Sequence, residues 1–283
     1  MRFANINGRA SLVVSYDAAG GQALDLEAVS GGRFTSDPMK AFAQWRNLRS
    51  LALSTDASLA KPFTNIDLHA PAPRPAQIFG IGLNYREHAT ETGAPIPDSP
   101  LTFTKFASSV NAPFGNIPIR VPTADWEVEL VAVVGSGGRD IPVDSAWTSI
   151  AGICVGQDIS DRLLQRATQP PQFSLGKSRE GYSPFGPWLL DIQAVENPDA
   201  LTLSCAVNGK EMQRSSTSDM IFSVPQLIAY LSTIVELLPG DVIYTGTPSG
   251  VGGARKPPQF LAPGDVIVST IDGIGAITNH CVA

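Results

Sequence analysis

Two glutamates stand two residues apart in the segment 125–134, which reads DWEVELVAVV. Its density of β-branched residues predicts a strand, and because strand side chains alternate between faces, Glu127 and Glu129 would lie on the same face. Neighbouring carboxylates in an apolar strand repel each other and lose hydration unless a cation lies between them. The alternative is a solvated edge strand, but Val131 and Val133 continue the face of the glutamates and favour a buried metal site.

A third acid follows the next apolar segment. The run IAGICVGQ at residues 150–157 predicts a strand that ends at Asp158, and residues 159–167 predict a helix. With Asp158 at the helix start, Arg162 and Gln165 would share its face; simple N-capping by Asp158 is the alternative. Three carboxylates without histidine or cysteine favour a hard ion, Mg²⁺ or Mn²⁺, with Ca²⁺ as a further option.

One of the three histidines lies three residues before an acid, in GLNYREHATE at residues 82–91. On a helical turn His88 and Glu91 face the same way, and a carboxylate beside the imidazole would fix its tautomer and raise its basicity. The pair is therefore a candidate general base that activates water. An exposed helix with a chance pairing is the alternative.

Two further segments carry groups that could bind a substrate anion. Lys177 lies between a glycine and a serine, where its ammonium can approach an anion closely. The loop YTGTPSGVG at residues 244–252 offers backbone N–H groups and a hydroxyl, with Gly246 and Thr247 as candidates. A surface lysine and an ordinary hairpin loop are the alternatives.

Other functional classes find little support in the sequence. The glycines at 80 and 82 lack the third glycine of a dinucleotide-binding loop, because Tyr85 stands there, and the P-loop glycine before Lys177 is replaced by Pro171. Neither GxSxG nor HExxH occurs. The net charge of −6 argues against nucleic acid or a membrane surface as partner, so we expect a small molecule.

The elements that must position these residues predict a strand-rich α+β chain in two parts. The length of 283 residues and the hydrophobic fraction of 43% suffice for a large domain with a small one. A proline-rich segment at 70–75 separates a small N-terminal domain, 1–70, from a catalytic domain, 71–283.

Hydrophobic patterns predict the elements of both parts. In the first part we expect strands at 1–6 and 10–16, a turn at Gly20-Gly21 and a helix at 37–53. In the second part we expect strands at 119–122, 126–134, 150–157, 201–207, 242–245 and 266–271, with helices at 159–167 and 224–237. The three scattered cysteines and the absence of a signal-like apolar stretch in the first twenty residues predict a cytoplasmic protein.

Read in order, the motifs of the chain resemble the fumarylacetoacetate hydrolase family over about residues 78–277. The matching segments are GLNYREHATE, residues 103–106, DWEVELVAVVG, GQDISDRLLQ, LGKS with YSPFGP, VNGKEMQ, MIF, LLPGDVIYTGTPSGVG and PGDVI. The resemblance implies a catalytic domain of mixed β-roll or β-barrel type, a homodimer, and Mg²⁺ or Mn²⁺ held by Glu127, Glu129 and Asp158.

The resemblance also implies roles for the other candidates. His88 and Glu91 would be the catalytic pair on a lid-like segment, while Arg162, Gln165 and Lys177 would line the pocket. Lys177 is also expected to stabilise negative charge during catalysis, and Thr247, Gly246 and Tyr85 are expected to bind substrate. After GKS the chain reads Arg-Glu-Gly, where family members often carry an aromatic residue or an acid, and this departure bears on specificity.

The activity implied is hydrolysis of a carbon–carbon bond in a small diketo acid, such as an acylpyruvate or fumarylpyruvate, in the catabolism of aromatic compounds. His88 would activate the attacking water. Decarboxylation of an oxaloacetate-like acid and isomerisation of an unsaturated oxo-diacid could use the same residues and stay open. A non-catalytic, metal-stabilised binding protein is the remaining alternative.

Overall fold

The N-terminal part of the chain holds five strands and three short helices. The structure is a computed structural model that describes residues 1–283. The elements of this part are β1 (Arg2–Ile6), β2 (Arg9–Tyr16), β3 (Gly20–Asp25), α1 (Leu26–Val29), α2 (Pro38–Phe42), α3 (Trp45–Ser54), β4 (Lys61–Thr64) and β5 (Leu68–His69).

The first two strands and a helical region near residues 37–53 agree with the sequence prediction. The helical region is two helices, because Asp37 caps α2 and a break at residues 43–44 precedes α3. The expected turn at Gly20-Gly21 is wrong, since both glycines lie in β3 opposite β4. A Cβ at Gly20 would overlap the backbone of Phe63, so this close approach of two strands requires the glycine.

The rest of the chain is dominated by strands. Its elements are β6 (Ile78–Gly82), α4 (Arg86–Thr92), β7 (Leu101–Thr104), β8 (Val110–Asn111), β9 (Ile117–Pro118), β10 (Ala124–Asp125), β11 (Val128–Val134), β12 (Ile150–Gln157), β13 (Ser160–Asp161), α5 (Arg162–Gln165), β14 (Ser183–Asp191), β15 (Thr202–Val207), β16 (Lys210–Ser216), α6 (Val224–Ile234), β17 (Val242–Tyr244), β18 (Val266–Ile271) and β19 (Gly275–Val282). The strand-rich α+β class is confirmed.

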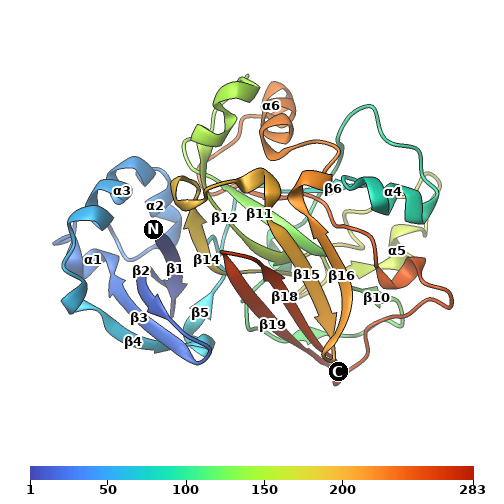
Figure 1. Cartoon of the computed structure of the whole chain (residues 1–283), viewed down its shortest axis with the longest axis horizontal. Coiled ribbons are helices and arrows are strands. Elements are labelled where there is room, and N and C mark those ends of the chain that lie inside the picture. The colour runs from blue at the N-terminus through green and yellow to red at the C-terminus, as the bar shows by residue number, and fades with distance from the viewer.

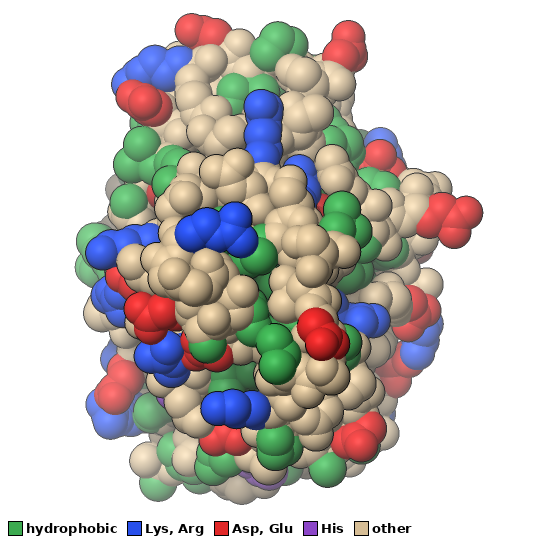
Figure 2. Space-filling view, turned by 90° about the vertical axis from the view of Figure 1, so that its left-hand side faces the viewer, with side chains coloured by type: hydrophobic (Ala, Val, Ile, Leu, Met, Phe, Trp, Pro, Cys, Tyr) green, Lys and Arg blue, Asp and Glu red, His purple; other side chains and the backbone are tan.

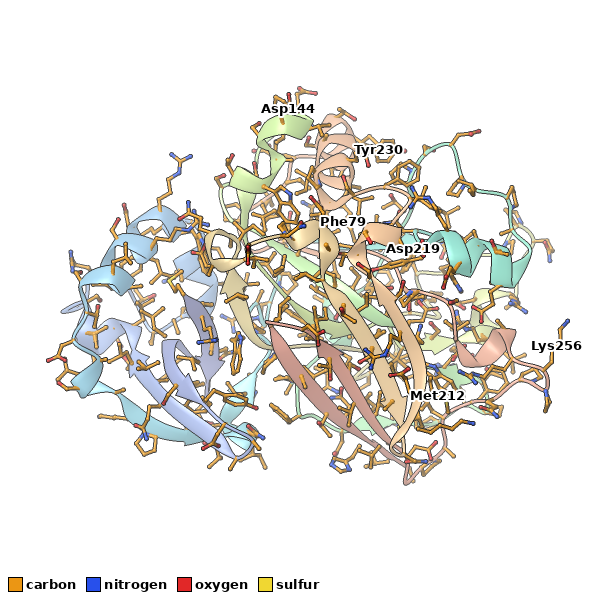
Figure 3. All side chains as sticks on the ribbon, viewed as in Figure 1. Phe79, Asp144, Met212, Asp219, Tyr230 and Lys256 are labelled. Carbon is orange, nitrogen blue, oxygen red and sulfur yellow. The ribbon has the colours of Figure 1, made fainter.

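One sheet of twelve strands runs through both parts of the chain (Figure 1). Its main path is β4-β3-β2-β1-β14-β12-β11-β17-β6-β7, and it is mixed because β17 pairs in parallel with β6. A second sheet, β16-β15-β18-β19-β9, packs on its central strands, so that Leu130 and Ile153 share one core with Leu203 and Ile267. Figure 3 shows the side chains of both sheets on the ribbon.

The two parts of the chain share a core as well as a sheet. β1 pairs with β14 through Phe3 and Leu189, and Phe3 packs in one cluster with Val131 and Tyr244 of the second part. The division at residue 70 therefore stays a prediction about where one folding unit ends. Acidic and basic side chains are interspersed on the face that the N-terminal part presents, without a basic patch there (Figure 2). None of the helices has the length and hydrophobicity that crossing a membrane would require.

Several element predictions in the second part need correction. Residues 119–122 are not a strand, and the expected helix at 159–167 is the four-residue α5, because residues 160–161 pair with β10 instead. The helix cap is therefore Asp161, which accepts from Leu164 N, and not Asp158. β14 is nine fully buried residues that the sequence analysis missed, since its prolines and glycine are typical of loops. The boundaries of β12 and β18 agree with the prediction.

Candidate active site and metal centre

The three predicted metal ligands come together through the pairing of β11 and β12. Val128 lies opposite Gln157, so Asp158, one residue further along, reaches Glu127, and Asp158 N donates to Glu127 O over 2.9 Å. Glu127, Glu129 and Asp158 each offer a carboxylate oxygen, and these atoms all lie within 4.8 Å of one another. All three side chains are buried.

Backbone and amide groups fix these acids in place. Glu127 N donates to Gln157 Oε1 over 2.8 Å, and Glu129 Oε2 accepts from Gly246 N over 2.7 Å. Gly246 has φ +104°, and a Cβ on it would lie 2.6 Å from that of Asn84. The position therefore requires glycine. Gly246 orients the predicted metal ligand Glu129 and does not line the cavity described below.

Three cations surround the carboxylates: Lys105 and Lys177 are buried, and Arg162 is partly buried. Lys177 Nζ lies 2.5 Å from Glu127 Oε2 and 2.6 Å from Asp158 Oδ2. Arg162 bridges two acids, with Nη2 2.6 Å from Glu127 Oε1 and Nε 2.7 Å from Asp125 Oδ2. Lys105 Nζ contacts Asp158 Oδ1 and is fully buried. The carboxylates are thus paired with cations from three different segments.

The charges in this cluster shift the pKa values of the two glutamates in opposite directions. Burial raises the pKa of Glu129 well above its usual value, and repulsion from Asp158 and Glu127 raises it further. Burial also opposes ionisation of Glu127, but Lys177 and Arg162 outweigh it and lower the pKa to about 2. The surroundings therefore favour the protonated form of Glu129 far more than that of Glu127. When Asp125, Glu127, Glu129 and Asp158 are all ionised, their four negative charges exceed the three positive charges around them by one. A cluster of oxygen donors with this excess of negative charge fits Mg²⁺ or Mn²⁺.

The histidine pair lies on α4. His88 is buried, and its Nδ1 lies 3.1 Å from Glu91 Oε2. The other oxygen of Glu91 accepts from Gly250 N over 2.9 Å, which ties the helix to the loop at 244–252. Asn84 holds the start of this segment through hydrogen bonds with the backbone of Phe222 and with Thr245 O. If Nδ1–H donates to Glu91, Nε2 is the basic nitrogen.

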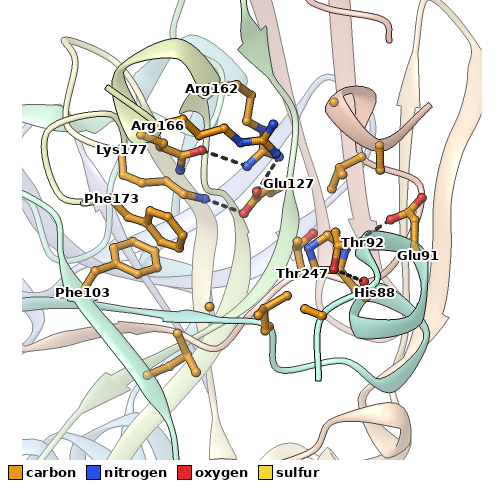
Figure 4. Close-up of a pocket in the computed structure, with 18 residues that line it drawn as sticks. His88, Glu91, Thr92, Phe103, Glu127, Arg162, Arg166, Phe173, Lys177 and Thr247 are labelled. Carbon is orange, nitrogen blue, oxygen red and sulfur yellow. Dashed lines mark hydrogen bonds and ion pairs between the residues drawn. The ribbon is translucent and has the colours of Figure 1, made fainter. Parts of the chain in front are cut away.

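A cavity of about 350 Å³ connects the pair to the carboxylates. Seven of the predicted site residues line it: His88, Glu91, Glu127, Arg162, Gln165, Lys177 and Thr247. In Figure 4, Arg162 and Lys177 lie on one side of the cavity and His88 with Glu91 on the opposite side. Phe103 and Phe173 pack edge to face and supply apolar wall.

The remaining predicted residues lie away from the cavity wall. Glu129 and Asp158 are not among the lining residues and are buried more deeply than Glu127. Tyr85 precedes α4, is fully buried and does not line the cavity. Its hydroxyl has no hydrogen-bond partner, and burial followed by the charge of Glu129 raises its pKa well above 10. Tyr85 therefore lies outside the cavity wall, and its role in substrate binding stays a prediction.

Two charged residues that build the site were not predicted from the sequence. Asp125 accepts from Gly252 N and Gly253 N and pairs with Arg162, so it fixes both the loop and the guanidinium. Lys105 donates to Asp158 and to the carbonyls of Lys177 and Tyr182. The signal for Asp125 was its place beside the glutamates, and that for Lys105 was a lysine inside the apolar run TFTKF.

Comparison with known proteins identifies the family. The family model for the C-terminal part of fumarylacetoacetate (FAA) hydrolase matches residues 77–282. The chain belongs to the fumarylacetoacetate hydrolase family. Mitochondrial oxaloacetate tautomerase fahd2 of Xenopus laevis is 43% identical over 223 residues, which cover 77% of this chain and 69% of the relative.

Solved structures of the family share the fold over the whole chain. A candidate HpcE protein from Mycobacterium smegmatis is 46% identical with a TM-score of 0.92, and covers 100% of this chain and 99% of its own. Fumarylacetoacetate hydrolase from Exiguobacterium antarcticum is 31% identical with a TM-score of 0.85 over 100% and 99%. The predicted fold of this family is confirmed, and the chain belongs to a family of enzymes that act on small molecules.

Proposed function

We propose that this chain is a divalent-metal-dependent enzyme that moves a proton beside the carbonyl of a small 2-oxo acid. The reaction to test first is enol–keto isomerisation of oxaloacetate, which the name of the Xenopus relative suggests. The observation that carries the proposal is that His88, paired with Glu91, and Glu127, one member of the three-carboxylate cluster, line opposite sides of one cavity.

Glu127, Glu129 and Asp158 would hold Mg²⁺ or Mn²⁺. The bound ion would polarise the carbonyl of the 2-oxo acid and make the neighbouring C–H bond more acidic. Lys177 keeps its ammonium within 2.6 Å of two of the carboxylates, and its positive charge stabilises negative charge that develops on the substrate oxygen.

His88 would carry the proton. Its Nε2 accepts the proton from the enol hydroxyl and returns one to the adjacent carbon, while Glu91 stabilises the imidazolium that exists between the two transfers. Phe103 and Phe173 reduce the access of water to that proton. Gln165 and Thr247 line the same cavity and would orient the carboxylate of the substrate.

Hydrolysis of a carbon–carbon bond in a diketo acid is the second candidate, since His88 could also deprotonate a water. The 31% identity to a fumarylacetoacetate hydrolase favours this alternative. Decarboxylation of oxaloacetate would use the same residues. The three reactions share substrate binding at the carboxylates and differ in their products.

The test is product analysis by NMR and mass spectrometry with Mg²⁺ or Mn²⁺ and then with chelator. Metal-dependent loss of enol-oxaloacetate without change in mass would support the isomerase. Two fragments from an acylpyruvate would support the hydrolase, and CO₂ with pyruvate the decarboxylase. The absence of turnover with both oxaloacetate and the acylpyruvate would contradict the proposal.

We also propose a cytoplasmic homodimer. The free and buried Cys154, Cys205 and Cys281 suit a reducing compartment, although the Xenopus relative is named as mitochondrial. Light scattering during size-exclusion chromatography would measure the mass, and one chain per particle would contradict the dimer.

A further inference from the structure

The cavity carries one cation that no acid neutralises. Arg162 and Lys177 line it, and both form ion pairs with the buried carboxylates. Arg166 lines the same cavity, but its guanidinium takes part in none of the hydrogen bonds or ion pairs of the structure. A guanidinium with five unused donors at the wall of a ligand cavity is a ready partner for a planar anion.

Arg166 lies further out than the other two cations. It is the C-cap residue of α5, four positions after Arg162, so both side chains leave the same face of this turn. The Arg162 side chain is 16% exposed and reaches Glu127, whereas Arg166 is exposed. In Figure 4, Arg166 is on the same side of the cavity as Arg162 and Lys177. The cavity therefore has an inner end at Glu127 and a cationic outer position at Arg166.

The acids that line the cavity are already engaged. Glu127 contacts Lys177 and Arg162, while Glu91 accepts from Gly250 N and contacts His88. No acidic side chain of the cavity is left for Arg166, so its guanidinium is available to an anionic group of a ligand. The volume of about 350 Å³ is near the lower end of the range for small-molecule sites, about 300–1,000 Å³, which favours a compact ligand.

We propose that Arg166 binds a second carboxylate of the substrate, at the end remote from the buried acids, and so selects 2-oxo diacids over 2-oxo monoacids. This inference rests on the proposed function, which places the 2-oxo acid group at Glu127, Glu129 and Asp158. Arg166 is a specificity-determining residue in this scheme, because the reacting carbon lies between the two ends. General attraction of anions by Arg166 would instead strengthen the binding of diacids and monoacids together.

Calorimetry on the Mg²⁺-loaded protein separates these possibilities. Oxaloacetate and pyruvate share the 2-oxo acid group and differ by the distal carboxylate. We expect wild type to bind oxaloacetate at least tenfold more tightly, and Arg166→Gln to weaken that binding about tenfold while the Kd for pyruvate changes less than twofold. Arg166→Lys should retain part of the preference. Arg139→Gln, on an exposed arginine paired with Glu236, is the matched control.

The inference is overturned if Arg166→Gln keeps the preference for oxaloacetate, or if it weakens both acids equally. Failure of the proposed function has a different signature. If the diacid preference depends on Arg166 but no metal-dependent turnover occurs, the specificity holds and the reaction is wrong. If neither acid binds to wild type, the 2-oxo acid site itself is rejected, and the inference with it.

Discussion

Replacing Lys105 by methionine tests whether the cation behind the metal ligands holds them in place. The Lys105 ammonium has three N–H donors, and three oxygens accept from it: Asp158 Oδ1, Lys177 O and Tyr182 O. Methionine is similar in length but lacks the donors, so one carboxylate oxygen and two carbonyls would lose a partner. Removing one partner of a buried ion pair costs about 3–5 kcal/mol.

Part of that cost is offset. Burial lowers the pKa of Lys105 despite the nearby charge of Asp158, so burying the ammonium is itself unfavourable and methionine removes this cost. We therefore expect the lower end of the range, about 3 kcal/mol. A loss of 1 kcal/mol lowers the melting temperature of a chain of about 150–250 residues by roughly 2–4 °C. The melting temperature of the variant should therefore fall by roughly 6–12 °C.

The assay is thermal unfolding in chelator, followed by circular dichroism, with Lys210→Met on exposed β16 as control. The double variant Lys105→Met/Asp158→Asn removes both charges and should lose less stability than the two single variants added together. Additive losses, or a loss in Lys105→Met no larger than in the control, would refute the reasoning.

Three further predictions concern the metal centre and the base. Because the pKa of Glu129 is raised in the folded protein, its contribution to stability without metal is fully present below about pH 4.5 and is lost as the pH rises through the raised pKa. A metal ion needs the ionised carboxylate, so the Kd for the metal should fall as the pH rises through the same window. Calorimetry in buffers of different ionisation enthalpy should detect the released proton, and a pH-independent Kd would contradict this. His88→Ala should lower kcat at least about 100-fold with an unchanged metal Kd, whereas exposed His280→Ala should change neither; full turnover would remove His88 from the mechanism. Gly246→Ala should weaken metal binding, because the new Cβ meets Asn84, while Gly264→Ala, with similar φ +96° and open space, should only lose stability; equal metal affinities in the two variants would contradict this.

The sequence revealed the carboxylate cluster because its geometry is local. Glu127 and Glu129 follow the period of a strand, and Asp158 ends the strand that pairs beside them, so a two-residue period and adjacency in the chain sufficed. The same holds for His88 and Glu91, which lie one helical turn apart.

The missed features depend on distant contacts or unusual residues. Lys105 acquires its role from partners 53 to 77 positions away, which no local pattern encodes. β14 contains two prolines and a glycine, and it is a strand only because β12 and β1 pair with it on both sides. Asp158 looked like a helix cap because residues 160–161 carry no sign that they pair with β10.

The cations around the carboxylates would allow the site to bind the proposed acid substrate. Four ionised carboxylates, Asp125, Glu127, Glu129 and Asp158, with a divalent ion would leave two negative charges and repel an anionic substrate. Lys105, Arg162 and Lys177 add three positive charges, so the loaded cluster carries one net positive charge. Without the ion, protonation of Glu129, which its raised pKa favours, would leave the same cluster neutral. Loading the proposed metal would therefore both complete the ligand set and change the net charge of the cluster from zero to positive, which would attract a 2-oxo acid.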